Sequence, residues 1–132
     1  MIERVRVTAD RDWYDGAGIA LGIRVGDFVF TSGQAPIDEY GRTVGTGDFA
    51  AQARRALANV ATVLANGGSG LDRVVKATVF VTDIGQQDIF AAVRAEHFPA
   101  HSFAESFVQV AALAEPDWMI EIEAVGVVGP GA

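Results

Sequence analysis

The stretch Phe28–Gln34 combines an apolar run with small polar groups that are suited to binding a ligand. Its first residues, Phe-Val-Phe, are typical of a buried strand, which gives way to the polar sequence Thr-Ser-Gly-Gln. Glycine lets a ligand approach the backbone closely, and the Ser32 hydroxyl and the backbone amides of the turn offer hydrogen bonds. The stretch therefore predicts a small-molecule site at Ser32 and Gly33, with a plain polar turn as the alternative.

Two carboxylates near the C-terminus are candidates for acid–base chemistry. Glu121 and Glu123 alternate with Ile120 and Ile122, so both glutamates are predicted to lie on one face of a strand. A carboxylate in a partly desolvated site can act as a general acid or a general base. The alternative is a polar sheet face without chemistry.

Histidine spacing raises the question of a metal site. His97 and His101 are four residues apart, with Glu96 beside the first, but Pro99 interrupts the helix that would align them. The chain has no cysteine, which excludes disulfides, thiolate catalysis and cysteine-based metal sites. We therefore predict no metal site.

Length and charge limit the classes of function. The 132 residues suit one domain, residues 1–132, with a single hydrophobic core. The formal net charge of −7 argues against nucleic acid or an anionic membrane as a partner, because both attract basic surfaces. The N-terminus does not resemble a signal peptide, and no apolar run is long enough to span a bilayer. We expect a soluble cytoplasmic protein.

Six strands and two helices are predicted to position these residues. Residues 48–66 repeat apolar side chains at three- and four-residue spacing, with Asp48 as the N-cap and a Gly-Gly pair as the stop. The sequence Gly26-Asp27 is typical of a hairpin. The predicted strands span residues 2–7, 19–25, 28–31, 74–81, 105–111 and 119–128, and the second helix spans 88–98. The order β-β-β-α-β-α-β-β indicates an α+β domain with a mixed sheet and both helices on one face.

Several segments together resemble one protein family. They read Gly-Asp-Phe-Val-Phe-Thr-Ser-Gly-Gln-Ala-Pro at 26–36, Gln52 with Asn59, Val-Lys-Ala-Thr-Val-Phe-Val-Thr-Asp at 75–83, Val-Gln-Val at 108–110 and Ile-Glu-Ile-Glu-Ala at 120–124. In this order and over nearly the whole chain, they resemble the RidA/YjgF family of small imine and enamine deaminases, once called endoribonuclease L-PSP.

The resemblance implies a fold, an assembly and an activity. It implies a chorismate-mutase-like subunit with a six-stranded sheet, a homotrimer, and ligand sites in clefts between neighbouring subunits. Typical members bind the carboxylate of a 2-imino or 2-enamino acid and position a water molecule that hydrolyses the C=N bond. They use no metal and no organic cofactor, so we expect a small-molecule substrate and no cofactor.

One position departs from the family pattern. Typical members carry Pro-Ala-Arg-Ser before the penultimate strand, and the arginine contacts the substrate carboxylate. The matching residues here are Phe-Ala-Glu-Ser at 103–106, so Glu105 stands at the arginine position and is expected to repel a carboxylate. A competing alignment of Pro-Ala-His-Ser at 99–102 puts His101 there, and neither alignment restores an arginine.

Glu105 and Glu121 together form a physical hypothesis. The resemblance associates Glu121 with holding the attacking water. If both carboxyl groups face one partly desolvated cleft, repulsion and burial raise the pKa of one, giving a general acid beside a carboxylate base. The alternative is that Glu105 pairs with an arginine, such as Arg94 or one from a neighbouring subunit, and has a structural role.

The other expected site residues also come from the resemblance. Ser32 and Gly33 match turn positions that line the family's cleft. Ile19, thirteen residues before Ser32, stands where many members have a tyrosine. Tyr14 or Trp13 is expected to cover the cleft in its place.

Two functions remain open from the sequence. The first is a divergent family hydrolase that acts on a small imine, enamine or related pathway intermediate, with Glu105 and Glu121 as the acid–base pair. The second is a non-catalytic trimeric small-molecule-binding or regulatory protein, which kept the fold and lost the deaminase chemistry along with the arginine.

Overall fold

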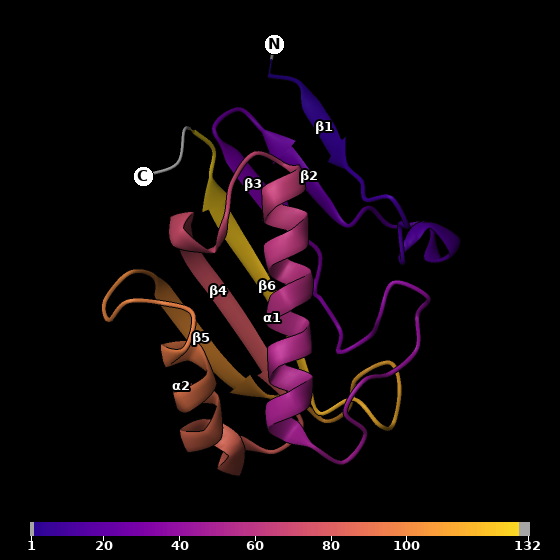
Figure 1. Cartoon of the computed structure of the whole chain (residues 1–132), viewed down its shortest axis with the longest axis vertical. Helices are drawn as coiled ribbons and strands as arrows, with labels where there is room; N and C mark the ends of the chain where they lie inside the picture. The colour runs from indigo at the N-terminus through magenta and orange to yellow at the C-terminus, as the bar shows by residue number, and fades with distance from the viewer. Residues whose placement is uncertain (1, 130–132) are drawn as a thin grey trace.

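The computed structural model describes residues 2–129, which form a mixed sheet with two helices against one face (Figure 1). The strands are β1 (Arg4–Val7), β2 (Gly22–Val25), β3 (Phe28–Thr31), β4 (Val74–Val81), β5 (Ala104–Gln109) and β6 (Ile120–Val127), and the helices are α1 (Phe49–Asn66) and α2 (Gln87–Ala95). The six strands lie in the order β1-β2-β3-β6-β4-β5. Only the β4–β5 pair within this sheet is parallel. The predicted α+β fold is therefore confirmed.

The long helix α1 begins and ends where the sequence predicts. The Asp48 carboxylate accepts a hydrogen bond from the backbone N–H of Ala51 at 3.0 Å, which satisfies one of the amides left free at the helix start. The helix ends at Asn66, before Gly67. One face of α1 packs on the sheet, and its buried apolar residues include Leu57, Val60 and Leu64.

The β2–β3 hairpin forms as predicted, but its first strand is shorter. Gly26 has a φ of 56°, a left-handed conformation that glycine adopts without steric cost, and Val25 lies opposite Phe28. The prediction of a strand from residue 19 is wrong for its first three residues, because β2 begins at Gly22. Gly22 lies opposite Thr31, the last residue of β3, so the residues before Gly22 have no strand partner.

Helix α2 is shorter than the predicted 88–98. It ends at Ala95, and only Phe90 and Val93 in it are buried. Phe98 precedes a proline, and residues before proline disfavour helical backbone angles. His97, which the sequence places near the apolar face, therefore lies beyond the helix and is exposed.

The two faces of the sheet differ sharply. Residues facing α1 and α2, such as Val79 and Ile122, are almost fully buried. The other face, here called the open face, is not covered by any element of the described chain. Phe28 is 45% exposed, Phe30 is 47% exposed and Val108 is 39% exposed there. The core therefore lies between the sheet and the helices.

Candidate functional site

The turn Thr31–Gln34 is held on both sides by backbone pairing. The Ser32 N–H donates to the carbonyl of Leu21 at 2.9 Å. The amides of Gln34 and Ile122 each donate to the other's carbonyl, at 2.7 and 3.1 Å. The intervening Gly33 forms no hydrogen bond through its amide within residues 2–129, and it is only partly buried. The turn therefore presents one free backbone donor at a fixed position.

The Ser32 hydroxyl already donates a hydrogen bond within the chain. The Ser32 Oγ donates to the carbonyl of Ala20 at 2.6 Å, which replaces the missing strand pairing before Gly22. The hydroxyl oxygen still has lone pairs that can accept a hydrogen bond from a ligand. Ile19 adjoins Ala20 and is 50% exposed, so the resemblance-derived site residues Ile19, Ser32 and Gly33 lie along one short stretch of surface.

Glu121 on β6 lies directly against this turn. A methyl group at Gly33 would lie 2.9 Å from Cδ and 3.0 Å from Oε2 of Glu121, so a larger residue there would displace the end of the Glu121 side chain. The Glu121 side chain is partly buried. Burial raises the pKa of the Glu121 carboxyl above its ordinary value, and the nearby charge of Glu123 raises this pKa further. The structure thus brings Gly33 and Glu121, two of the residues singled out in the sequence, side by side.

Tyr14 does not lie over this site, because its hydroxyl holds the turn from within. The Tyr14 hydroxyl donates to the carbonyl of Gly33 at 2.6 Å and accepts from the N–H of Ala35 at 3.2 Å. The side chain is 9% exposed. Burial raises the pKa of Tyr14 to about 12, although the hydrogen bond from Ala35 partly offsets this effect. Tyr14 therefore remains a neutral hydrogen-bonding group that positions Gly33.

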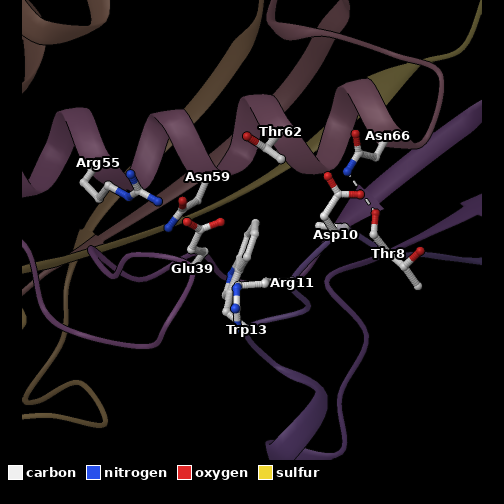
Figure 2. A pocket seen from close by; sticks show the side chains of 10 residues that line it. Thr8, Asp10, Arg11, Trp13, Glu39, Arg55, Asn59, Thr62 and Asn66 are labelled. Atoms are coloured by element: carbon white, nitrogen blue, oxygen red, sulfur yellow. Dashed lines mark hydrogen bonds between the residues drawn. The ribbon is translucent and has the colours of Figure 1, made fainter.

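Trp13 lines the hollow beside α1 and points toward that helix (Figure 2). Its indole Nε1–H donates to Oε1 of Gln34 at 3.0 Å. The expectation that Trp13 or Tyr14 covers the ligand cleft therefore does not match their placement within one chain. The loop carrying both aromatic residues fixes the position of the turn, and no periodic pattern in the sequence indicates this.

Glu105 lies on the other face of the sheet from Glu121. Glu105 is paired with Ala77 of β4, and Ala77 is paired with Ala124 of β6, both of which face the helices. Glu121 is paired with Phe80, whose side chain faces the open side. Side chains alternate between faces along a strand, so the two carboxylates cannot meet within one chain. The hypothesis of a shared cleft for Glu105 and Glu121 is wrong for a single chain.

Glu105 is instead paired with a cation from α2. Arg94 Nη1 lies 2.6 Å from Oε2 of Glu105, which is the alternative that the sequence leaves open. The other carboxylate oxygen of Glu105 is buried and has no hydrogen-bond partner within the described chain. Arg94, Glu105 and His101 line the same cavity of about 440 Å³ between α2 and residues 98–103. Both alignments of the arginine position therefore lead to one cavity, here called the α2 cavity.

The two histidines lie in different surroundings. His101 has a φ of 64° in the turn before β5, and His97 is exposed after the end of α2. Within residues 2–129, no group of three histidine or carboxylate side chains is arranged to hold a metal ion.

A hollow of about 590 Å³ lies beside α1 and is not indicated by any motif (Figure 2). Arg55, Asn59 and other side chains project into it from α1, opposite residues 8–13 and Glu39. Several of these groups bind loop backbone: Arg55 Nε donates to the carbonyl of Ile37 at 2.8 Å, and Asn66 donates to that of Thr8 at 2.9 Å. This hollow therefore ties the loops to α1.

Comparison with known proteins identifies the family. A family model described as endoribonuclease L-PSP matches residues 19–128, which is most of the chain. The chain belongs to this RidA/YjgF family. The YjgF gene product of E. coli has a crystal structure that superposes with a TM-score of 0.80 at 33% identity, covering 93% of this chain and 98% of that one. Tyr14, whose hydroxyl binds the Gly33 carbonyl, precedes the segment that matches the RidA/YjgF family model.

Two relatives in the RidA/YjgF family carry names that state an activity. The 2-iminobutanoate/2-iminopropanoate deaminase of Salmonella typhimurium is 40% identical over 112 residues, covering 80% of this chain and 84% of that protein. The 3-aminoacrylate deaminase RutC of Acinetobacter baylyi is 37% identical over 99 residues, covering 75% of this chain and 78% of that protein. Within residues 2–129, no helix has the length and apolar character needed to cross a membrane.

Proposed function

We propose that this chain is a hydrolase that converts a small imine or enamine into a carbonyl compound and ammonia. The observation that carries the proposal is the partly buried Glu121 carboxylate, packed against Gly33 beside a free backbone amide. The names of the two deaminase relatives support the same class of reaction.

Glu121 is the proposed proton-transfer group. It removes a proton from water as the water oxygen forms a bond to the C=N carbon. The π electron pair of the C=N bond moves to nitrogen at the same time. The nitrogen takes the proton from Glu121, which becomes a carboxylate again. Glu121 then moves the hydroxyl proton to nitrogen, the C–N bond breaks, and ammonia leaves as the carbonyl forms. A raised carboxyl pKa supports this role, because a base and an acid form are then both accessible closer to neutral pH.

The turn supplies the groups that orient the substrate. The free amide of Gly33 donates a hydrogen bond to an oxygen of the ligand, and the Ser32 hydroxyl accepts one from an N–H group. Gly33 lies directly beside the Glu121 carboxylate, and Ser32 is the residue before Gly33. Because Tyr14 holds the Gly33 carbonyl, the position of the free amide is fixed before a ligand binds.

Assembly through the open face is part of the proposal. Phe28 and Phe30 lie side by side on this face with ring centroids 6.5 Å apart, and both are about half exposed. A contiguous exposed apolar patch of this kind marks a protein–protein interface. We propose that copies of this chain cover it in a homotrimer, as the family resemblance implies. Glu121 lies on the same face, so assembly would also shield it from water.

The test measures ammonia release from freshly generated 2-imino acids and from uncarboxylated imines. Glu121→Gln keeps the shape of the side chain but cannot accept a proton, and we expect activity to fall about 100-fold or more. Glu123→Gln is the comparison variant on the same strand, and we expect a much smaller effect from it, because Glu123 is exposed and acts only through its contribution to the raised pKa of Glu121. Activity that persists in Glu121→Gln and falls in Glu123→Gln would reject the assignment.

A second function is favoured by one specific feature. Glu105 stands where typical members have arginine, so a binding protein that lost deaminase chemistry also fits the sequence. A native chain that binds a small ligand but releases no ammonia from any imine tested, in a correctly assembled oligomer, would favour this second function.

A further inference from the structure

The loop between β1 and β2 holds the Gly33 turn, and one carboxylate of that loop is enclosed. Asp12 lies two residues before Tyr14, whose hydroxyl binds the carbonyl of Gly33 at 2.6 Å. The Asp12 side chain is 12% exposed, whereas that of Asp15 in the same loop is 73% exposed. Removing a carboxylate from water is costly unless hydrogen-bond partners replace the lost hydration. No step of the proposed reaction uses Asp12, so its enclosure needs another reason.

Both carboxylate oxygens of Asp12 have partners within the loop and the sheet. The backbone N–H of Tyr14 donates to Oδ1 at 3.1 Å, and this arrangement fixes the backbone two residues after an aspartate. Arg6 Nη2 donates to Oδ2 at 2.8 Å. The carbonyl of Asp12 also accepts from the N–H of Asp15 at 3.2 Å, which closes the turn. Asp12 therefore joins the loop to a side chain of the sheet.

The cation that binds Asp12 comes from β1. Arg6 lies opposite Ile23 in the pairing of β1 with β2, so its backbone is fixed by the sheet. Its guanidinium binds both Asp12 and Asp15, at 2.8 and 3.0 Å. The Arg6 side chain is 49% exposed, and an exposed ion pair adds little to overall stability. The pair instead restricts the direction in which the loop leaves β1.

We propose that Asp12 is a positioning residue, which fixes the backbone of Tyr14 so that the tyrosine hydroxyl holds Gly33 in place for the ligand. The proposal rests on the proposed function, because ligand binding by the Gly33 amide belongs to that function. The Tyr14 hydroxyl also accepts from the N–H of Ala35 at 3.2 Å, so a displaced Tyr14 would release the turn at two points. Asp12 precedes residue 19, where the match to the family model begins.

The expected consequence is on the rate of reaction more than on ligand binding. A donor that is fixed before the ligand arrives does not have to be ordered during the reaction. Gly33 also packs against the Glu121 carboxylate, so a displaced turn changes the surroundings of the proton-transfer group. Loss of the Asp12 carboxylate should therefore lower kcat more than it raises KM.

Hydrogen exchange of the Ala35 amide tests the positioning without any substrate. Ala35 is fully buried, and its amide donates to the Tyr14 hydroxyl. In the native oligomer of Asp12→Ala, we expect this amide to exchange about 10-fold faster than in the native chain. The Val110 amide, at the far edge of the sheet, should keep its native rate. Native exchange of Ala35 in Asp12→Ala would overturn the proposal.

Two further variants separate the two contacts of Asp12. Asp12→Asn keeps an oxygen that accepts from the Tyr14 N–H, so exchange of the Ala35 amide should stay close to native. Arg6→Gln removes the ion pair at an exposed position and serves in place of Asp12→Ala if that variant does not fold. Faster exchange of the Ala35 amide in Arg6→Gln supports the proposal, and in that case a native rate contradicts it.

Ammonia release separates positioning from a general loosening of loops. Asp12→Ala should lower kcat about 10-fold with a smaller change in KM, and Asp12→Asn should restore most of it. Asp38→Ala is the matched control, because Asp38 Oδ1 accepts from the backbone N–H groups of Tyr40 and Arg42, both at 2.9 Å, in a loop that does not hold Gly33. Asp38→Ala should keep the native kcat. Equal losses in both alanine variants would contradict the proposal.

A double variant shows whether Asp12 acts through Tyr14. Tyr14→Phe removes the hydroxyl that binds Gly33 and Ala35, and it should lower kcat by itself. Adding Asp12→Ala should then cause little further loss, because the hydroxyl that Asp12 positions is already absent. A further loss of about 10-fold would show that Asp12 acts by another route, and would overturn the proposal.

The exchange measurement distinguishes failure of this inference from failure of the proposed function. If the native chain releases no ammonia, exchange of the Ala35 amide still reports whether Asp12 positions Tyr14. If ammonia release depends on Glu121 but Asp12→Ala keeps both the native kcat and the native exchange, the proposed function stands and this inference fails.

Discussion

Glu121 and Glu105 are the same residue type in one sheet, but their surroundings give them different chemistry. Glu121 is partly buried against Gly33 and forms no salt bridge within residues 2–129. Glu105 lies on the opposite face, enclosed beside α2, with Arg94 as its partner. The pKa of the Glu121 carboxyl is raised by burial and by the charge of Glu123, whereas Glu105 is held in place by its ion pair with Arg94. Burial without a cation suits Glu121 to proton transfer, whereas the Arg94 partner suits Glu105 to a structural role.

The largest expected effect comes from displacing the Glu121 carboxylate without removing it. In Gly33→Ala the new methyl group would lie 2.9 Å from Cδ of Glu121, so the flexible end of that side chain must move. Because a displacement of about 1 Å can reduce catalysis about 100-fold, we expect a comparable loss of ammonia release. Thermal unfolding should change little, since the contact is with the far end of a side chain rather than with backbone.

A matched substitution shows whether the effect is local. Gly16→Ala adds the same methyl group at a glycine where nothing lies within 4 Å, and its activity should equal that of the native chain. Full activity in Gly33→Ala would mean that the position of Glu121 against the turn is not important for the reaction.

The next largest effect is on the free energy of unfolding and comes from the ion pair between Arg94 and Glu105. Arg94→Gln leaves Glu105 enclosed without a cation, and we expect a loss of about 2 kcal/mol in the free energy of unfolding. Adding Glu105→Gln should restore most of it, because no charge then remains to be solvated. Urea unfolding at one fixed protein concentration measures both changes. Equal stability of Arg94→Gln and the native chain would show that the ion pair is too well solvated to act as an anchor.

The sequence predicts the fold well because the patterns that specify it are local. Glu121 and Glu123 are placed on one face by the alternation of their own strand, and α1 is defined by its spacing and its Asp48 cap. The face of Glu105 depends on the register of β5 against β4, which no local pattern reveals. Tyr14 lies in a loop without periodicity, so its hydrogen bonds to the turn could not be predicted either.

The smallest expected effect is a pH dependence of stability from Glu121. Its pKa is raised in the folded chain above the ordinary value of 4.5, so the folded state holds this proton more tightly than the unfolded state. The resulting stability is present below the unfolded pKa and is lost as pH rises through the folded pKa. Glu121→Gln cannot titrate and therefore does not lose this stability. We expect the melting temperature of the variant minus that of the native chain to be larger at pH 8 than at pH 4.

The pH difference also tests the cause of the raised pKa. Glu123→Gln removes the nearby charge that contributes to it, so the pH range over which native stability falls should become narrower. Glu115→Gln, in an exposed loop, should leave the pH dependence unchanged. If the melting temperatures of Glu121→Gln and the native chain differ by the same amount at pH 4 and pH 8, Glu121 titrates as a solvated carboxyl. The contrast between Glu121 and Glu105 would then rest on geometry alone, on the face that each occupies and the partner that each has.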